Sequence, residues 1–114
     1  MTSVKFKDSI CTLQKATYEN GRPRLSLVDE EGPVATCTVN MPDVPLGRNQ
    51  VLIKDYGENE TMLVALEAAG VIKPTGQTIR SGFVEIPICE LQPPYQEKAH
   101  TDGVNQSRNR TRGR

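Results

Sequence analysis

The sequence has no tryptophan, and its only histidine, His100, lies near the C-terminus. Nucleophilic catalysis by serine or cysteine usually depends on a nearby histidine that acts as a base. No histidine precedes residue 100, and neither a Walker phosphate loop nor the pattern G-x-G-x-x-G occurs. We therefore expect a protein that is not an enzyme and that needs no cofactor.

Metal ligands are sparse as well. The three cysteines, Cys11, Cys37 and Cys89, are widely spaced and form no C-x-x-C pair, which argues against a zinc or thioredoxin-type site. Each lies in an apolar or β-branched run, where free cysteine behaves as a small hydrophobe. The acidic residues within 29–31 and 58–60 fit a turn and a helix start. We predict no metal site and three reduced, mostly buried thiols, as in a reducing cytosol.

Long apolar runs are also missing. No stretch approaches the roughly 20 apolar residues that span a bilayer, and Lys5, Lys7 and Asp8 interrupt any signal peptide. We expect a cytoplasmic protein without membrane association. Its zero net charge is unevenly divided, because residues 1–96 carry nine Lys and Arg against twelve Asp and Glu, whereas residues 97–114 carry five against two. A mildly acidic domain thus precedes a basic arm.

The composition changes at Pro93-Pro94. Apolar runs and turn signals precede this dipeptide, whereas the polar, arginine-rich sequence QEKAHTDGVNQSRNRTRGR follows it. Such a segment cannot bury enough apolar surface to fold by itself. We predict one folded domain over residues 1–92 and a disordered basic tail over residues 93–114.

The first half of the domain is rich in strand signals. Residues 4–18 predict an irregular strand or two short ones. Asn20-Gly21 predicts a hairpin with a type I′ turn, in which both central residues have positive φ. A second strand is expected to end at Asp29, and residues 34–41 predict a third, with alternate residues on its two faces. Three such strands form an antiparallel meander.

A helix follows the loop and the short apolar run at 51–53. Asn59 is the expected N-cap, because its side chain can accept from backbone N–H groups two or three residues on. Gly70 fits the position just after the helix. We predict 10–12 helical residues, held to the sheet by an apolar stripe of Met62, Leu63, Leu66 and Ala69.

The last part of the domain is predicted to contain a turn over residues 73–76 and a final strand over residues 83–91. Pro87 cannot donate to a sheet ladder, which favours an edge position or a bulge. The element order predicts an α+β fold. Its small twisted antiparallel sheet combines the N-terminal meander with the C-terminal strand, and one short helix packs on it.

Two groups of residues are candidates for binding. Asn40, Tyr56, Glu58 and Asn59 converge if the helix folds back over the sheet, where they would recognise a protein partner or a small anion. Alternatively, Asn40 only ends a strand and Asn59 only caps the helix. In the tail, arginines suit contacts to nucleic-acid phosphates, unless the tail is merely solubilising. They are Arg108, Arg110, Arg112 and Arg114.

Four segments, TVNMPD, YGENE, EAAGVIKPTG and RSGFVEIPICEL, resemble a family of small, largely uncharacterised proteins. This family is encoded on conjugative elements, plasmids and phages of gut-type bacteria, and the resemblance covers about residues 16–91. It implies no catalytic residues. It does imply a context in which genes of this size often encode antagonists of host defence, or accessory factors that bind host proteins.

We therefore expect a non-enzymatic binding protein of a mobile genetic element, whose partner is a host or element-encoded protein. Inhibition of a host defence system is one form of this function. Two alternatives remain open: a weak nucleic-acid-binding accessory protein that uses the arginine tail, and a sponge for a small ligand such as a nucleotide. A homodimer formed through a free sheet edge also remains open.

Overall fold

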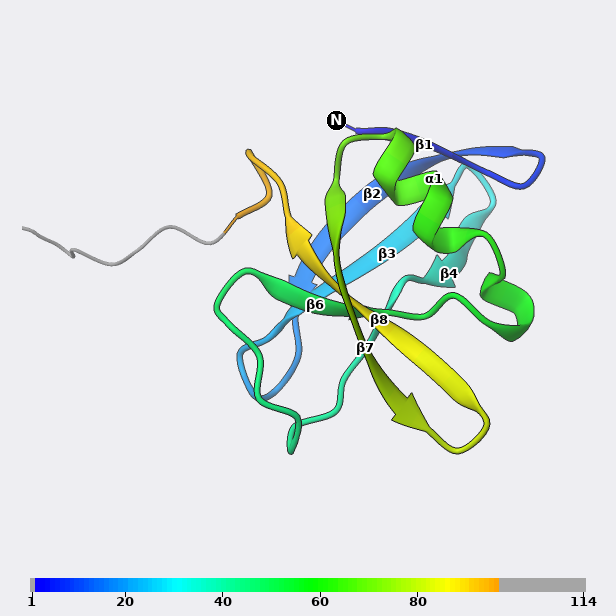
Figure 1. Cartoon of the computed structure of the whole chain (residues 1–114). Helices are drawn as coiled ribbons and strands as arrows, with labels where there is room; N and C mark the ends of the chain where they lie inside the picture. The colour runs from blue at the N-terminus through cyan, green and yellow to red at the C-terminus, as the bar shows by residue number, and fades with distance from the viewer. Residues whose placement is uncertain (1, 97–114) are drawn as a thin grey trace, which may run out of the picture.

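The computed structural model of the chain describes residues 2–96. These residues form two antiparallel four-stranded sheets, with strand order β1-β2-β3-β4 in sheet A and β5-β6-β8-β7 in sheet B. In Figure 1 the strands of the two sheets run across each other, and the helix α1 lies at one end. The elements are β1 (Ser3–Phe6), β2 (Ser9–Thr17), β3 (Pro23–Asp29), β4 (Gly32–Thr36), β5 (Thr38–Val39), β6 (Gln50–Ile53), the 3-10 helix η1 (Gly57–Asn59), α1 (Met62–Ala68), β7 (Ile72–Ser81) and β8 (Val84–Leu91).

The fold is broadly α+β, as predicted, but the prediction of a single twisted sheet was wrong. The third predicted strand is divided at Cys37 into β4, which pairs with β3, and β5, which pairs with β6. Cys37 and Thr38 are both buried although they are neighbours, so the two-residue alternation fails there. At this point the Thr38 hydroxyl is hydrogen-bonded to the hydroxyl of Tyr18 (2.8 Å) and accepts from the N–H of Leu25 (3.3 Å).

The β-prone run 4–18 contains two strands, so the second of the two predicted arrangements is confirmed. A turn at Lys7-Asp8 joins β1 to β2, and Lys7 has a φ of 55°. The Lys7 ammonium lies 5.3 Å from the centre of the Phe6 ring and donates to the carbonyl oxygen of Glu58 (2.8 Å). This contact attaches the β1–β2 turn to η1.

The hairpin predicted at Asn20-Gly21 is confirmed, but its turn type was wrong. Gly21 has a φ of 85°, and Asn20 is not among the described residues with positive φ. The Tyr18 N–H donates to the carbonyl of Arg22 (2.8 Å), and the Gly21 N–H donates to that of Tyr18 (2.9 Å). This pattern is a type I turn followed by a left-handed glycine, in which only the glycine needs positive φ.

The main core lies between the two sheets and α1. Its buried members come from β1, β2, β3, β6, α1, β7 and β8 and include Val4, Leu25, Leu27, Ile53 and Leu66, all 0% exposed. The three cysteines are buried and unpaired, which confirms that prediction. Leu27 and its neighbours on the inner face of β3 therefore belong to the same interior as the helix stripe.

The helix is shorter than predicted, with seven residues, and Asn59 is not its N-cap. Asn59 ends η1 and is 5% exposed; its Nδ2 donates to the carbonyl of Thr36 (2.7 Å). The first turn of α1 is capped by Asp55 instead, whose Oδ1 accepts from the N–H of Leu63 (2.8 Å). A separate 3-10 turn intervenes because Thr61, with a φ of 80°, breaks the helical path before Met62.

The predicted end of the helix and its apolar stripe are confirmed. Gly70 has a φ of 76° and its N–H donates to Glu67 (3.0 Å), while the N–H of Val71 donates to Leu66 (3.0 Å). These paired bonds define a Schellman motif, which a glycine completes without steric strain. Met62 and Leu66 are fully buried, and α1 packs against β1 and β7.

The turn predicted at residues 73–76 was wrong, because β7 continues through it. Pro74 pairs with Cys89 and Thr78 pairs with Pro87, with an irregularity between them. Gly76 has a φ of 90°, so the turn-like residues form a bulge inside one long strand. The hydroxyl of Thr75 supports this bulge by donating to the carbonyl of Ile88 (2.8 Å).

Of the two positions predicted for Pro87, the edge position was wrong, since β8 lies between β6 and β7. A bulge does lie beside it, in β7 between Pro74 and Thr78, and Thr78 pairs with Pro87. The ladder of β6 with β8 ends at Leu52 and Ile88. In antiparallel strands, successive residues direct their backbone groups to alternate sides. The N–H of Leu91 faces β6, where it donates to Asn49 (2.8 Å), so the missing N–H of Pro87 faces the same side. Pro87 thus ends the pairing of β8 with β6 and leaves β8 paired to β7 alone.

The described chain continues past residue 92. The N–H of Tyr95 donates to the carbonyl of Gln92 (2.8 Å), and its ring packs against the main core. The rest of the predicted basic tail, residues 97–114, lies outside the described residues.

Candidate protein-binding face

The end of the β7–β8 hairpin carries the most exposed apolar side chain of the described residues. Ser81 pairs with Val84, so Gly82 and Phe83 form a two-residue turn. Gly82 has a φ of 61°, as the first central residue of a type II′ turn requires. Phe83 is 101% exposed. We name residues 78–87, which lie beyond the end of β6, the hairpin arm; in Figure 1 it extends away from the other strands.

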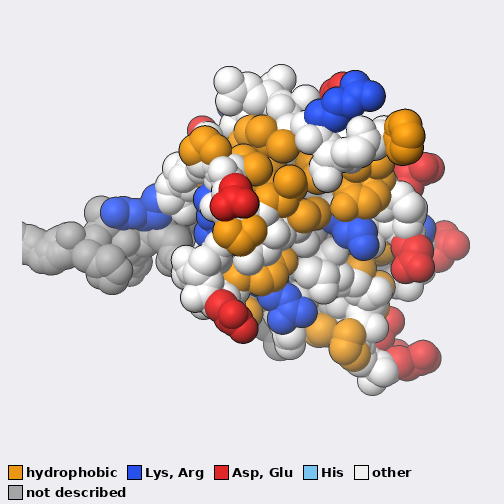
Figure 2. Space-filling view, turned by 90° about the horizontal axis from the view of Figure 1, so that it is seen from below, with side chains coloured by type: hydrophobic (Ala, Val, Ile, Leu, Met, Phe, Trp, Pro, Cys, Tyr) orange, Lys and Arg blue, Asp and Glu red, His pale blue; other side chains and the backbone are white. Residues whose placement is uncertain are grey.

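The outer face of sheet B, which faces away from the main core, is also apolar. Leu52, Ile86 and Ile88 are at most 7% exposed and form a second hydrophobic cluster. They are covered by half-buried side chains from the strands and the following loops, namely Val39, Met41, Leu46, Tyr56, Ile79 and Val84. In the view of Figure 2, hydrophobic side chains gather over the middle of the surface, with acidic and basic side chains among and around them. This face continues into the hairpin arm through Ile79 and Val84.

The loop between β5 and β6 is held over this face by hydrogen bonds between side chains and backbone groups. The guanidinium of Arg22 donates to the carbonyls of Met41 (2.7 Å) and Val44 (2.5 Å). At the other end of the loop, Oε1 of Gln50 accepts from the N–H of Gly47 (2.9 Å). The side chains that cover the second cluster are therefore held in place.

Of the four predicted binding residues, only Tyr56 lies on the outer face of sheet B. Its ring packs on the second cluster, and the Lys54 ammonium lies 5.7 Å from the ring centre. Such a cation–π contact at a partly exposed site adds about 0.5–1 kcal/mol. An aromatic ring with a nearby cation suits contacts to a partner protein.

The other three predicted residues make contacts of their own, and Asn59 also donates its backbone N–H to the carbonyl of Tyr56 (3.0 Å). Asn40 follows β5 and accepts through Oδ1 from Nδ2 of Asn20 (3.1 Å). Glu58 is exposed in η1, and Asn59 is buried against the end of β4. The arrangement expected around the helix start is thus replaced by a structural role for Asn59. The arginines Arg108, Arg110, Arg112 and Arg114 lie outside the described residues.

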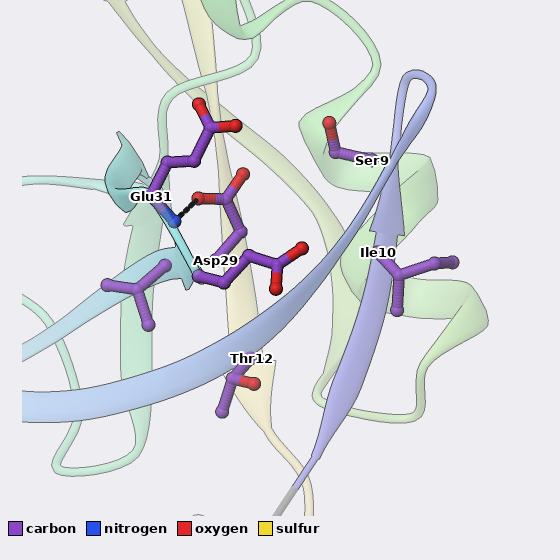
Figure 3. A pocket seen from close by; sticks show the side chains of 7 residues that line it. Ser9, Ile10, Thr12, Asp29 and Glu31 are labelled. Carbon is purple, nitrogen blue, oxygen red and sulfur yellow. Dashed lines mark hydrogen bonds between the residues drawn. The ribbon is translucent and has the colours of Figure 1, made fainter.

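The outer face of sheet A has a different character. It contains a hollow of about 640 Å³ whose lining includes Ser9, Ile10, Thr12, Asp29 and Glu31. Figure 3 shows these side chains and the contact in which Oδ1 of Asp29 accepts from the N–H of Glu31 (2.9 Å). This turn explains the acidic cluster structurally, as expected. Ile10 is 65% exposed beside it.

A second hollow of about 240 Å³ adjoins the first on sheet A. Its lining is mixed, with the amide of Gln14, the guanidinium of Arg24 and the hydroxyls of Ser26 and Thr36 among apolar groups. The two hollows share Val28. The outer face of sheet A is therefore concave and mixed in character, with polar groups beside exposed apolar side chains such as Ile10 and Val34, whereas that of sheet B is apolar and carries a projecting arm.

The buried thiols are held in their neutral form. Burial raises the pKa of Cys37 to about 12, with a smaller effect from Cys11. Burial likewise raises the pKa of Cys89 to about 12, with smaller effects from Glu67 and Asp55. A thiol rather than a thiolate is a poor nucleophile and metal ligand. These groups therefore serve packing.

Within residues 2–96, no group of three or more His, Cys, Asp or Glu side chains is placed to hold a metal ion. No helix in this part of the chain has the length and apolar character needed to cross a membrane. Comparison with protein-family models, curated proteins and solved structures finds no match to the chain.

Sequence reasoning did not single out Phe83, which was assigned to the start of the final predicted strand. The dipeptide Ser81-Gly82 between two β-prone runs is a turn signal. With a two-residue turn at Gly82-Phe83, the aromatic ring falls at the end of the hairpin rather than on a sheet face. That placement was available from the sequence.

Proposed function

We propose that the chain is a non-enzymatic binding protein of a mobile genetic element and that its partner is a protein. Inhibition of a host defence system is one form of this function. The observation that carries the proposal is the full exposure of Phe83 beside the apolar outer face of sheet B. Exposed aromatic side chains next to apolar patches are typical of protein-interaction sites.

The partner is expected to be a protein rather than a membrane surface. One aromatic side chain buries too little apolar area for stable membrane attachment. The hairpin arm carries one positive and one negative side chain, Arg80 and Glu85, so it lacks the basic surplus that anionic lipids attract. In a protein partner, an apolar pocket would accept the ring of Phe83.

Affinity capture with matched variants tests this proposal. The full chain is immobilised as wild type, as Phe83→Ser and as Ile10→Ser, and each is exposed to a lysate of the bacterial host. Ile10 is the control because it is an exposed apolar residue on the other sheet. We expect one protein to be retained by wild type and Ile10→Ser and to be lost with Phe83→Ser. Retention that does not depend on Phe83, or no specific retention at all, would contradict the proposal.

A further inference from the structure

Among the strands of residues 2–96, β7 has a neighbour on one side only, because it stands at the end of sheet B. In a two-residue hairpin the residues that flank the turn exchange both backbone hydrogen bonds, and the ladder alternates from there. The Ser81–Val84 and Ile79–Ile86 pairs therefore bond within the hairpin. It follows that the backbone N–H and C=O groups of Thr78 and Arg80 point outward, to the free edge.

The first half of this edge is protected against further pairing. By the same alternation, Pro74 faces outward, and proline has no N–H to offer another strand. The bulge around Gly76 comes next along β7, and α1 also packs against this strand. Proline and bulges are the usual devices by which proteins block exposed sheet edges.

The second half, within the hairpin arm, lacks these devices. Thr78 and Arg80 are exposed, and no backbone hydrogen bond from another described element reaches them. The regular pairing from Thr78 to Ser81 leaves an extended edge next to the fully exposed Phe83. An unprotected sheet edge is a template for an added strand.

The side chains along this edge define what would fit it. Ile79 belongs to the apolar outer face of sheet B, whereas Arg80 lies opposite Glu85 on the other face. Oε1 of Glu85 accepts from the hydroxyl of Thr78 (3.3 Å), while Nε of Arg80 donates to the carbonyl of Gly82 (3.3 Å). Among the described residues, no carboxylate forms an ion pair with Arg80.

A second copy of β7 is a poor match for this edge, because β7 contains Lys73 and Arg80 but no carboxylate. Like charges opposite each other destabilise a strand pair, whereas opposite charges stabilise it. An acidic strand would instead extend the row of charges from Glu85 across Arg80.

We propose that an extended acidic segment of the partner protein adds to sheet B as a strand along residues 78–81. An apolar residue of this segment lies beside Ile79, and a carboxylate lies beside Arg80. The inference rests on the proposed protein-binding function and specifies how the partner is held. Backbone hydrogen bonds from Thr78 and Arg80 supply attachment, and Phe83 packs against the partner beyond the end of the added strand.

Peptide binding to the full chain tests strand addition directly. The probes are two labelled nine-residue peptides, one alternating valine with glutamate and the other alternating valine with lysine, measured by fluorescence anisotropy. Arg80→Pro removes an outward N–H that β8 does not use, so the hairpin ladder is retained. Arg80→Glu reverses the charge. Because every variant keeps the same basic tail, differences between variants report the hairpin arm.

We expect the acidic peptide to bind wild type and to bind either variant with about tenfold lower affinity. Arg80→Pro loses a backbone hydrogen bond to the peptide, whereas Arg80→Glu places like charges opposite each other. The lysine peptide should gain affinity with Arg80→Glu and not with Arg80→Pro. Unchanged far-ultraviolet circular dichroism and urea midpoint would show that the variants fold. If Arg80→Pro does not fold, strand addition is tested by Arg80→Glu alone, which should bind the acidic peptide more weakly and the lysine peptide more tightly than wild type does. Equal binding by wild type and both variants, or no binding up to about 1 mM, would overturn strand addition.

Failure of this inference is distinguishable from failure of the proposed function. A protein whose capture depends on Phe83 but persists with Arg80→Pro would support the binding function and refute strand addition. Sedimentation of the wild-type chain as a dimer that Arg80→Pro converts to monomer would assign the edge to a second copy and overturn the proposed occupant.

Discussion

The outer faces of the two sheets differ although both are four-stranded antiparallel sheets. On sheet A, polar side chains such as Thr12, Gln14 and Ser26 line adjoining hollows. On sheet B, the buried residues Ile86 and Ile88 lie under a layer of half-buried apolar side chains. One face is wetted, whereas the other contains a second small core. This difference is the basis for placing the proposed interaction surface on sheet B and its projecting hairpin arm.

This difference originates in the strand sequences. In β3, leucines at 25 and 27 face the core, and Arg24 and Ser26 face outward, as expected for a sheet with one solvated face. In β8, Cys89 and Leu91 face the main core while Ile86 and Ile88 fill the outer cluster. A strand that is apolar on both faces is covered on both faces.

The largest expected effect distinguishes the two outer faces by stability. Ile86→Ala removes a buried side chain from the outer face of sheet B and should lower the free energy of unfolding by about 2–4 kcal/mol. Ser26→Ala, at the outer face of sheet A, should change it by less than about 0.5 kcal/mol. Urea unfolding followed by circular dichroism measures both. Similar small losses for the two variants would mean that sheet B has no second core.

The interior shared by the two sheets is tested by pH. Folding raises the pKa of Cys37 and Cys89 from 9.0 to about 12. The unfolded thiols therefore ionise first, and their contribution to stability is present below pH 9 and is lost as the pH rises from about 9 to 12.

From pH 8 to pH 10, we expect these two thiols together to account for a loss of about 1–2 kcal/mol, a value reduced for solvent screening. The control is the double variant Cys37→Ala/Cys89→Ala, measured by urea unfolding with a reducing agent at each pH. The variant is less stable throughout but should lose less stability over this interval. Identical losses for variant and wild type would contradict the burial of these thiols.

The closure of the core by α1 is tested at its N-terminus. Asp55→Ala removes the acceptor for the Leu63 N–H and should lower the free energy of unfolding by about 1 kcal/mol. Asp55→Asn keeps a side-chain oxygen and should recover most of this loss. Thermal unfolding compares the two variants. If both lose the same amount, the contribution of Asp55 comes from its charge and not from this hydrogen bond.

The smallest stability effect is expected at the end of the hairpin arm. Phe83→Ala removes a fully exposed side chain and should change the free energy of unfolding by less than about 0.5 kcal/mol. Thermal unfolding beside wild type provides the measurement. A loss above 1 kcal/mol would show that Phe83 packs within the molecule and is not available to a partner.

Much of the fold was predictable because its signals are local. Asn20-Gly21 marks a hairpin and Gly70 ends the helix, since both depend on positive φ at a glycine. The division into two sheets was not predictable in this way. It involves the hydrogen bond of Thr38 with Tyr18, a contact between residues 20 positions apart.

The candidate site was predicted only in part, for a related reason. Tyr56, one of the residues predicted to bind a partner, packs on the second cluster, but Asn59 was assigned to a helix cap although tertiary packing places it against Thr36. Pro87 suggested that the last strand lies at an edge, whereas β8 is internal and its hairpin partner β7 ends sheet B. The side of a strand that remains unpaired depends on strand order, which sequence patterns do not specify.

Site-specific photo-crosslinking tests the central difference between the sheets most directly. A photoreactive phenylalanine analogue replaces Phe83 on sheet B in one sample and Ile10 on sheet A in another, each in the full chain within host cells. We predict a discrete crosslinked protein from position 83 and none from position 10. Crosslinking from position 10 alone, or equally from both positions, would contradict the assignment of the binding face to sheet B.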